Sequence, residues 1–229
     1  MYTYLQLKQK VAELTQHVSY DSAGTATYDA NFLGKIGTWL NASQKNLAQM
    51  YDFWTELQAI HSFDTSHPFA GVEAYSMPAN FDKPFRVYDL TSTAEITPIT
   101  EEEYSDANIA NIADSTEGQP TQYRIYGVSS RLKQMKFGLI PDGVYSIRVL
   151  YKSVPTDMSA DDDYPFMDAD RYLIFDACGF AWKWESKENE ATTAWGLADK
   201  ALTVLLNNQM SNLGVQHKIV SSWAQAHRQ

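Results

Sequence analysis

Apolar residues recur at helical spacing in the first part of the chain. One run predicts a short amphipathic helix over about 3–17, because residues three and four apart share a helix face. Its apolar members are Leu5, Leu7, Val11, Leu14 and Val18. The turn-rich stretch 19–27 ends this helix. A second run predicts a long helix between Asp29 and His61, with Asp29 as its N-cap, since this side chain can accept hydrogen bonds from the first free amides.

The middle of the chain changes to period-two spacing. Alternating residues predict strands over 84–90, 123–128, 134–140 and 144–151. Pro141-Asp142-Gly143 separates the last two, and this turn chemistry predicts that they form a β-hairpin. We expect a loop over 61–68, and a short helix beginning at Thr100. The middle is therefore predicted to be mostly antiparallel β-structure.

Helical patterns return after Pro155. The run 170–184 is apolar on most sides and predicts a buried helix, and 186–212 predicts a second helix with Gly214 as its C′ residue. The sequence thus predicts an α+β protein in which both chain ends form a helical bundle around an inserted antiparallel β-domain. The expected domains are 1–71 with 156–214 for the bundle, 72–155 for the β-rich insertion, and 215–229 as an extended tail.

Composition narrows the class of protein. The chain has 229 residues, with 18 basic and 28 acidic residues and a net charge of −10. This balance argues against a general duplex-DNA binder, which needs a basic face to displace counterions. The single Cys178 cannot form an internal disulfide, no apolar run approaches the length of a membrane span, and no signal peptide is visible. We expect an acidic, folded protein made in a reducing compartment.

Charge is distributed unevenly along the chain. Six acidic residues and no base lie between Asp157 and Asp170, whereas six bases and one acid lie between Arg124 and Lys152. Complementary patches of this kind can drive self-association. Solvated polar faces are the simpler interpretation of this charge pattern and the one we favour. The pattern is therefore compatible with an oligomer but does not require one.

The acidic clusters have structural and chemical interpretations. Asp161-Asp162-Asp163 could attract a hard cation, but the EF-hand spacing is absent, and we favour loop and cap roles, with Asp168 placed at the start of the next helix. Glu101-Glu102-Glu103 could supply a carboxylate pair for glycoside hydrolysis, but acids in the first turn of a helix are the simpler interpretation. No metal or cofactor is predicted.

Other catalytic and ligand-binding signals are weak. His61 and His67 flank Asp64 and Ser66, but no G-x-S-x-G turn presents a nucleophile, so a polar loop is favoured. Cys178 lies in an apolar helix and is expected to be buried and inert. The glycine-rich nucleotide-binding loops are missing. The tryptophans could form a sugar platform, although packing in the core is favoured for most of them; they are Trp39, Trp54, Trp182, Trp184, Trp195 and Trp223.

A series of short segments carries a family resemblance. In chain order they are Trp54-Thr55-Glu56-Leu57, the run 75–88, the run 118–125, Leu150-Tyr151-Lys152-Ser153-Val154-Pro155 and Asp161-Asp162-Asp163-Tyr164-Pro165-Phe166, followed by two helices. This order resembles the head-to-tail adaptor, or connector, proteins of tailed bacteriophages. The resemblance covers nearly the whole chain, apart from the tail 215–229.

The resemblance implies a structural virion protein rather than an enzyme. Such adaptors form a homo-oligomeric ring, usually of twelve copies, beneath the portal protein, in the neck between capsid and tail. They extend the DNA channel without binding DNA specifically, and they dock a downstream tail or nozzle protein. Assembly would take place in the host cytoplasm, without a membrane. The alternatives are a phage-associated cell-wall glycan hydrolase and a glycan-binding tail module.

Two sets of residues are expected to serve an adaptor. An acidic channel wall would repel DNA phosphates, and its candidate residues are Glu101, Glu102, Glu103, Asp161, Asp162 and Asp163. The acid-free tail is expected to insert between portal subunits, unless it is simply a disordered C-terminus. Its candidate contact residues are Lys218, Ile219, Val220, Trp223 and Arg228.

Overall fold

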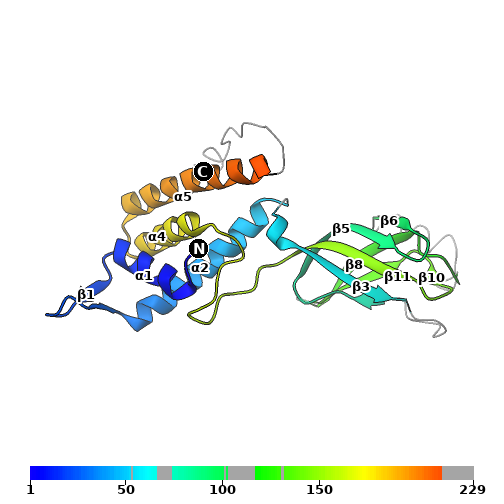
Figure 1. The fold of residues 1–229 in the computed structure, drawn as a ribbon, viewed down its shortest axis with the longest axis horizontal. Helices are drawn as coiled ribbons and strands as arrows, with labels where there is room; N and C mark the ends of the chain where they lie inside the picture. The colour runs from blue at the N-terminus through cyan, green and yellow to red at the C-terminus, as the bar shows by residue number, and fades with distance from the viewer. Residues whose placement is uncertain (53, 66–73, 101, 103–116, 130–131, 213–229) are drawn as a thin grey trace. The chain divides into compact units, whose positions relative to one another are not determined.

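The computed structural model describes residues 1–52, 54–65, 74–100, 102, 117–129 and 132–212. Over these residues the protein is α+β, as predicted, with four α-helices and a seven-stranded sheet (Figure 1). The chain divides into two compact units, Met1–Tyr51 with Thr156–Gln229, and Asp52–Pro155. We call the first the helical unit and the second the β unit.

Helix α1 spans Tyr4–Leu14 and begins with a capping box. The Thr3 hydroxyl accepts a hydrogen bond from the Gln6 amide at 3.3 Å, and the Gln6 side chain accepts one from the Thr3 amide at 2.9 Å. The helix is shorter than the predicted 3–17, because Gln16 adopts a φ of 63°. Val18, expected on the helix, instead begins β1 (Val18–Tyr20), which pairs with β2 (Ala26–Tyr28).

Helix α2 spans Ala30–Met50, and Asp29 is its N-cap, as predicted. The Asp29 carboxylate accepts from the amides of Asn31 at 2.8 Å and Phe32 at 3.3 Å. The predicted continuation to His61 is wrong. The next elements are a 3₁₀ turn, η1 (Thr55–Leu57), and strand β3 (Gln58–Asp64).

Strand β3 also corrects the predicted loop over 61–68, of which residues 66–68 lie outside the described residues. Its residues alternate strictly between exposed and half-buried, so the segment has strand periodicity although its polar residues suggest a loop. Trp54 and Leu57, which fall at helical spacing within the predicted helix 29–61, are instead buried residues of the β unit.

The last two described helices agree closely with the sequence pattern. Helix α4 spans Asp170–Trp184, and α5 spans Glu188–Asn212. A buried stripe along α5 packs against α4, and its members are Ala191, Ala194, Ala198, Leu202 and Leu206. The cap expected at Asp168 is wrong, because Ala169 holds the N-cap position and makes no side-chain cap bond. The predicted C′ residue Gly214 lies outside the described residues.

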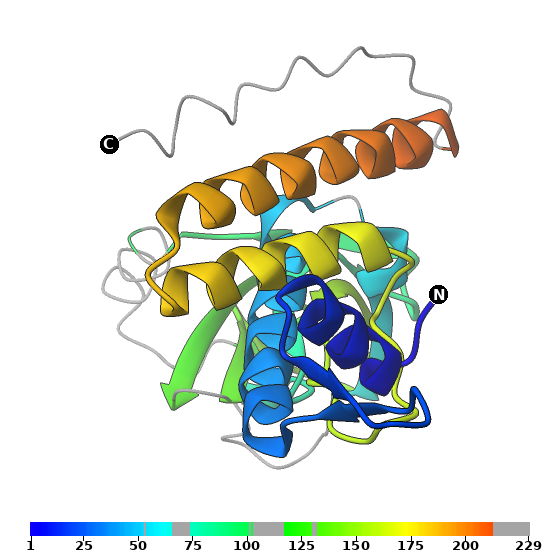
Figure 2. The ribbon, with the colours of Figure 1, turned by 90° about the vertical axis from the view of Figure 1, so that its left-hand side faces the viewer.

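Helix α4 is the centre of the helical unit. It contacts α1, α2 and α5, and Figure 2 shows α5 running alongside it. The segment leading into α4 is tied to α2 by two side chains. Asn41 exchanges two 2.9 Å hydrogen bonds with the backbone of Met158, and the fully buried Gln44 amide donates to the Thr156 carbonyl at 2.9 Å. Buried polar groups are therefore paired where the chain returns to this unit.

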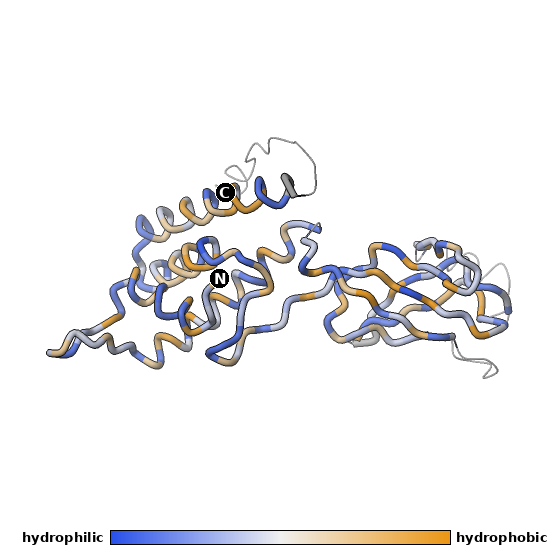
Figure 3. Tube along the Cα trace, in the orientation of Figure 1, coloured by the Kyte–Doolittle hydropathy of each residue, from blue (hydrophilic) through white to orange (hydrophobic). Residues whose placement is uncertain are grey.

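Seven strands form the sheet of the β unit, in the spatial order β3-β11-β5-β6-β8-β9-β4. Besides β3, they are β4 (Ala74–Ser76), β5 (Phe81–Asp89), β6 (Ala94–Pro98), β8 (Gln122–Ser129), β9 (Leu132–Phe137) and β11 (Ser146–Ser153). One face packs into a core that includes the nearly inaccessible Val87, Ile96, Met135, Ile147 and Val149. The strands accordingly alternate between hydrophobic and hydrophilic residues in Figure 3.

The hairpin predicted around Pro141-Asp142-Gly143 is wrong. Strand β9 pairs with β8 and β4, whereas β11 pairs with β3 and β5. Pro141 instead belongs to β10 (Ile140–Pro141), which pairs in parallel with β7 (Glu117–Gly118). Strands β6 and β8 are also parallel, with Thr97 opposite Gln122, so the sheet is mixed rather than wholly antiparallel. Long-range ladders have overridden the local turn preference.

Candidate functional site

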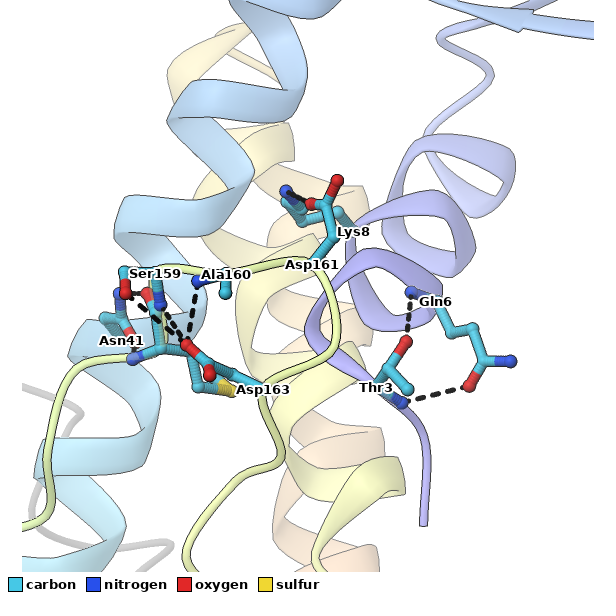
Figure 4. Close-up of polar contacts among 9 residues, drawn as sticks. Thr3, Gln6, Lys8, Asn41, Ser159, Ala160, Asp161 and Asp163 are labelled. Atoms are coloured by element: carbon cyan, nitrogen blue, oxygen red, sulfur yellow. Dashed lines mark hydrogen bonds and ion pairs between the residues drawn. The ribbon is translucent and has the colours of Figure 1, made fainter.

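The aspartate-rich loop 157–163 is held in place by its own carboxylates (Figure 4). Asp163 accepts hydrogen bonds from the amides of Ser159 at 2.6 Å and Ala160 at 2.8 Å. These backbone amides lower the pKa of the Asp163 carboxyl, because hydrogen bonds to a carboxylate favour its charged form. Asp163 therefore closes the loop through its carboxylate, which is the kind of loop role that the sequence favoured.

The same loop is attached to α1 and α2. Lys8 on α1 forms an ion pair with Asp161 at 2.8 Å, and Lys45 on α2 forms one with Asp157 at 2.6 Å. The backbone amide of Tyr4 donates to the Asp163 carbonyl at 2.7 Å. Asp162 is exposed. In the described part of the chain, no group of three or more His, Cys, Asp or Glu residues is arranged to hold a metal ion.

The remaining predicted surface residues are only partly described. Glu102 is exposed, whereas Glu101 and Glu103 lie outside the described residues. The tail candidates all lie outside them as well: Lys218, Ile219, Val220, Trp223 and Arg228. The structure therefore brings Asp161, Asp162 and Asp163 together in one loop.

The outward face of the sheet carries a basic and apolar patch that the sequence pattern did not reveal. Leu150 on β11 lies opposite Ile60 on β3 and Arg86 on β5, and Arg148 lies opposite Tyr88. Both arginines are exposed, as is 63% of Ile60. The Arg86 guanidinium donates to the Tyr88 hydroxyl at 3.0 Å. We call these five residues the outer β patch.

The two-residue alternation of side chains along a strand places each of these residues on the polar side of its own strand, and nothing more. Their proximity follows from the pairing of β11 with both β3 and β5, which a local pattern does not specify. Lys152 was also missed. It is only 3% exposed, and its ammonium forms an ion pair with Asp52 at 3.2 Å inside the β unit.

The candidate catalytic residues have structural partners or lack access to solvent. Asp64 accepts from the Ser146 hydroxyl at 2.6 Å and lies on the exposed face of β3, whereas the half-buried His61 lies on the other face. Burial lowers the pKa of His61 and raises the pKa of the Cys178 thiol to about 12. Such a thiol is poorly nucleophilic at neutral pH.

Two further carboxylates, the buried Asp89 and the half-buried Asp176, also accept hydrogen bonds. Asp89 accepts from the Thr91 amide at 2.8 Å and the Ser92 hydroxyl at 2.6 Å, which closes the turn between β5 and β6. Asp176 on α4 accepts from the Ser43 hydroxyl of α2 at 2.6 Å. Burial, with a smaller contribution from the charge of Asp199, raises the pKa of Asp176. Both side chains join elements rather than face an open cleft.

Most of the described tryptophans pack against neighbouring side chains. Trp54 is fully buried, and Trp39 lies against Trp184 with their ring centroids 6.4 Å apart. Trp184 is 53% exposed, and the Lys35 ammonium lies 3.7 Å from its ring centroid. Trp223 lies outside the described residues.

Comparison with known proteins gives one family. Residues 2–219 match the family described as SU10 adaptor protein. A search of the curated proteins finds no match. In the described residues, no helix is long and apolar enough to cross a membrane. The match covers nearly all of the 229 residues and confirms the resemblance to phage head-to-tail adaptors. The chain therefore belongs to the SU10 adaptor protein family.

Proposed function

We propose that this protein is the head-to-tail adaptor of a tailed bacteriophage, a structural and non-enzymatic component of the virion neck. In this proposal, about twelve copies form a ring beneath the portal, which extends the DNA channel and docks the downstream tail protein. The single observation that carries the proposal is the family match over residues 2–219.

We further propose that the two compact units correspond to the functional domains. The helical unit would be the bundle formed by both chain ends, and the β unit would be the inserted domain. The support is the division of the chain near Tyr51 and Thr156, of which the second boundary coincides with the predicted 155/156 and the first lies 20 residues before the predicted 71/72. In a ring, such an insertion can project a separate contact surface from a common body.

The channel wall is proposed to be acidic. Of the six candidate acids, Asp161 is paired with Lys8 and Asp163 closes its own loop, so their charges are partly compensated. Asp162 and Glu102 are exposed and are the strongest candidates among the described residues. Negative side chains on the wall would keep DNA phosphates from adhering during passage.

The portal contact is proposed to be the tail 215–229. This segment has no acidic residue, and it combines Lys218 and Arg228 with Ile219, Val220 and Trp223. An apolar and weakly basic segment of this composition can become ordered on a partner. We propose that the outer β patch contacts the downstream tail protein, because exposed arginines beside Ile60 and Leu150 are typical of an interface core and rim.

The decisive experiment is the mass of the purified chain, alone and mixed with the portal protein from the same genome. Light scattering gives the mass, and negative-stain imaging shows whether a ring forms on the portal. A ring on the portal is the expected result. A chain that ignores the portal contradicts the proposal.

A shortened chain that lacks 215–229 tests the tail. It is expected to keep the far-ultraviolet circular dichroism of the full chain and to lose portal docking. Unchanged docking would exclude the tail as the contact. A clearing assay on cell walls and a glycan-binding assay test the two alternatives, and the adaptor proposal expects both to be negative.

A further inference from the structure

Two hollows open along one side of helix α5 in the helical unit. One has a volume of about 460 Å³ and is lined by Val204, Leu205 and Asn208 of α5, together with Met1 and Tyr2. The other has a volume of about 450 Å³, and its lining includes Thr193 and Leu197 of α5, together with Leu14 and Trp182. Helix α4 supplies the opposite wall of both.

The two hollows lie on the same faces of both helices. On α5 the lining residues follow steps of three and four from 190 to 208, and on α4 they do so from 171 to 182. Residues at such steps share one side of a helix. Since α4 and α5 run side by side (Figure 2), the two hollows follow one another along the same seam between these helices, which we call the α4–α5 groove. It extends about 27 Å along α5 at 1.5 Å per residue.

The groove leaves large apolar side chains in water. Five of the exposed large hydrophobic residues of the helical unit line it: Met1 at 52%, Tyr2 at 40%, Leu14 at 50%, Leu197 at 39% and Val204 at 60% exposed. Exposed apolar side chains gathered along one seam mark a binding site for a chain segment or a partner. The exposed Glu190 gives one end an acidic margin. At the other end the Met1 ammonium lies 4.0 Å from Asp168 and 3.5 Å from Asp170, and the exposed Arg171 lines the same hollow, so the charges there are mixed.

We propose that the C-terminal segment 213–229 of the same chain occupies the α4–α5 groove before the protein joins an assembly. The segment supplies apolar residues that match the groove: Leu213, Val215, Ile219, Val220 and Trp223. It contains Lys218 and Arg228 but no acid, which suits the acidic margin at Glu190.

Tethering favours this occupant over a second copy. The segment begins directly after Asn212, one turn beyond Asn208 at the end of the groove. Its 17 residues reach about 56 Å when extended, twice the length of the groove, so the chain can turn back and still follow the whole surface. A tethered segment has an effective concentration in the millimolar range, which a free partner rarely reaches.

Trypsin cleavage after Lys218 in the full-length chain tests this proposal, because a docked segment is protected. Val204→Glu places a charge in the groove and should speed cleavage about tenfold, the factor expected when the burial of one valine is lost. Val144→Glu is the matched control, since Val144 in the β unit is 59% exposed against 60% for Val204. It should leave the cleavage rate unchanged. Circular dichroism checks that both variants keep their helices.

Each outcome decides the proposal. Faster cleavage of the Val204→Glu chain alone, independent of protein concentration, supports docking within one chain. Equal cleavage of the parent and both variants overturns it, and so does protection that increases with concentration, which would assign the groove to a second copy. The inference does not rest on the adaptor function. A failure to dock on the portal would leave the cleavage result unchanged.

Discussion

The indole ring of Trp195 on α5 lies directly against the backbone of Gly179 on α4. A Cβ atom on residue 179 would overlap the ring, since its nearest neighbours would be three indole atoms of Trp195. The Phe180 ring meets the same indole edge-on, with the centroids 5.9 Å apart. The absence of a side chain at Gly179 thus sets how closely these two helices approach.

Gly179→Ala is therefore expected to destabilise the helical unit. An added methyl group forces the indole or the helices apart, which costs about 1–3 kcal/mol. Gly196→Ala on α5 is the matched control, because a Cβ there meets nothing within 4 Å. Alanine should stabilise that helix by up to about 1 kcal/mol. Urea unfolding followed by helical circular dichroism measures both, and equal effects would contradict the packing role of Gly179.

The helices of this protein could be predicted from sequence because their signals are local. The apolar run 170–184 became α4 without a change of bounds, and Asp29 caps α2 as its position suggested. The end of α2 could not be predicted in this way. Apolar residues continue at helical steps through Trp54 and Leu57, but these buried residues lie after the chain has entered the β unit, outside α2.

The strand partners and surfaces were harder to predict because they depend on distant residues. Pro141-Asp142-Gly143 has strong turn chemistry, yet β11 does not pair with β9. It lies between β3 and β5 and forms long ladders with both. The outer β patch arises from the same pairings. Sequence placed the loop 157–163 correctly as acidic, but not the ion pairs with Lys8 and Lys45 that attach it to the helices.

Cys178 is expected to resist thiol reagents in the folded protein. It is only 3% exposed, and burial raises the pKa of its thiol to about 12, so little thiolate is present at pH 8. Its reaction with an aromatic disulfide reagent should be more than about a hundredfold slower in the native chain than in denaturant. Rapid labelling of the native chain, with its circular dichroism intact, would show that the thiol is accessible.

Asp163→Ala should lower the thermal midpoint of unfolding at neutral pH, because two backbone amides lose their acceptor. The native pKa of this carboxyl is depressed, so its contribution is present above the unfolded value of about 3.9 and is lost as pH falls through the native value. The parent and the variant should therefore converge in acid. Asp162→Ala, at an exposed position in the same loop, is expected to have little effect at any pH. A difference that persists at pH 2 would point to a packing defect instead.

Asp176→Asn should have the opposite pH signature. Burial raises the native pKa of the Asp176 carboxyl, and the charge of Asp199 adds to the shift, while the Ser43 hydroxyl opposes it. The native state then holds its proton at a pH where the unfolded chain has released it. The stability of the parent therefore falls as pH rises from about 3.9 through the native pKa. Asparagine cannot ionise, and its carbonyl can still accept from Ser43 across the 2.6 Å contact. The variant should be more stable than the parent at pH 7, and its stability should not fall between about pH 3.9 and the native pKa of the parent carboxyl. Thermal unfolding at a series of pH values measures both effects.

Asp199→Asn should give a smaller change in the same direction, because it removes only the smaller of the two causes that raise the pKa of Asp176. A less stable Asp176→Asn chain at pH 7 would mean that the charged carboxylate holds α2 and α4 together.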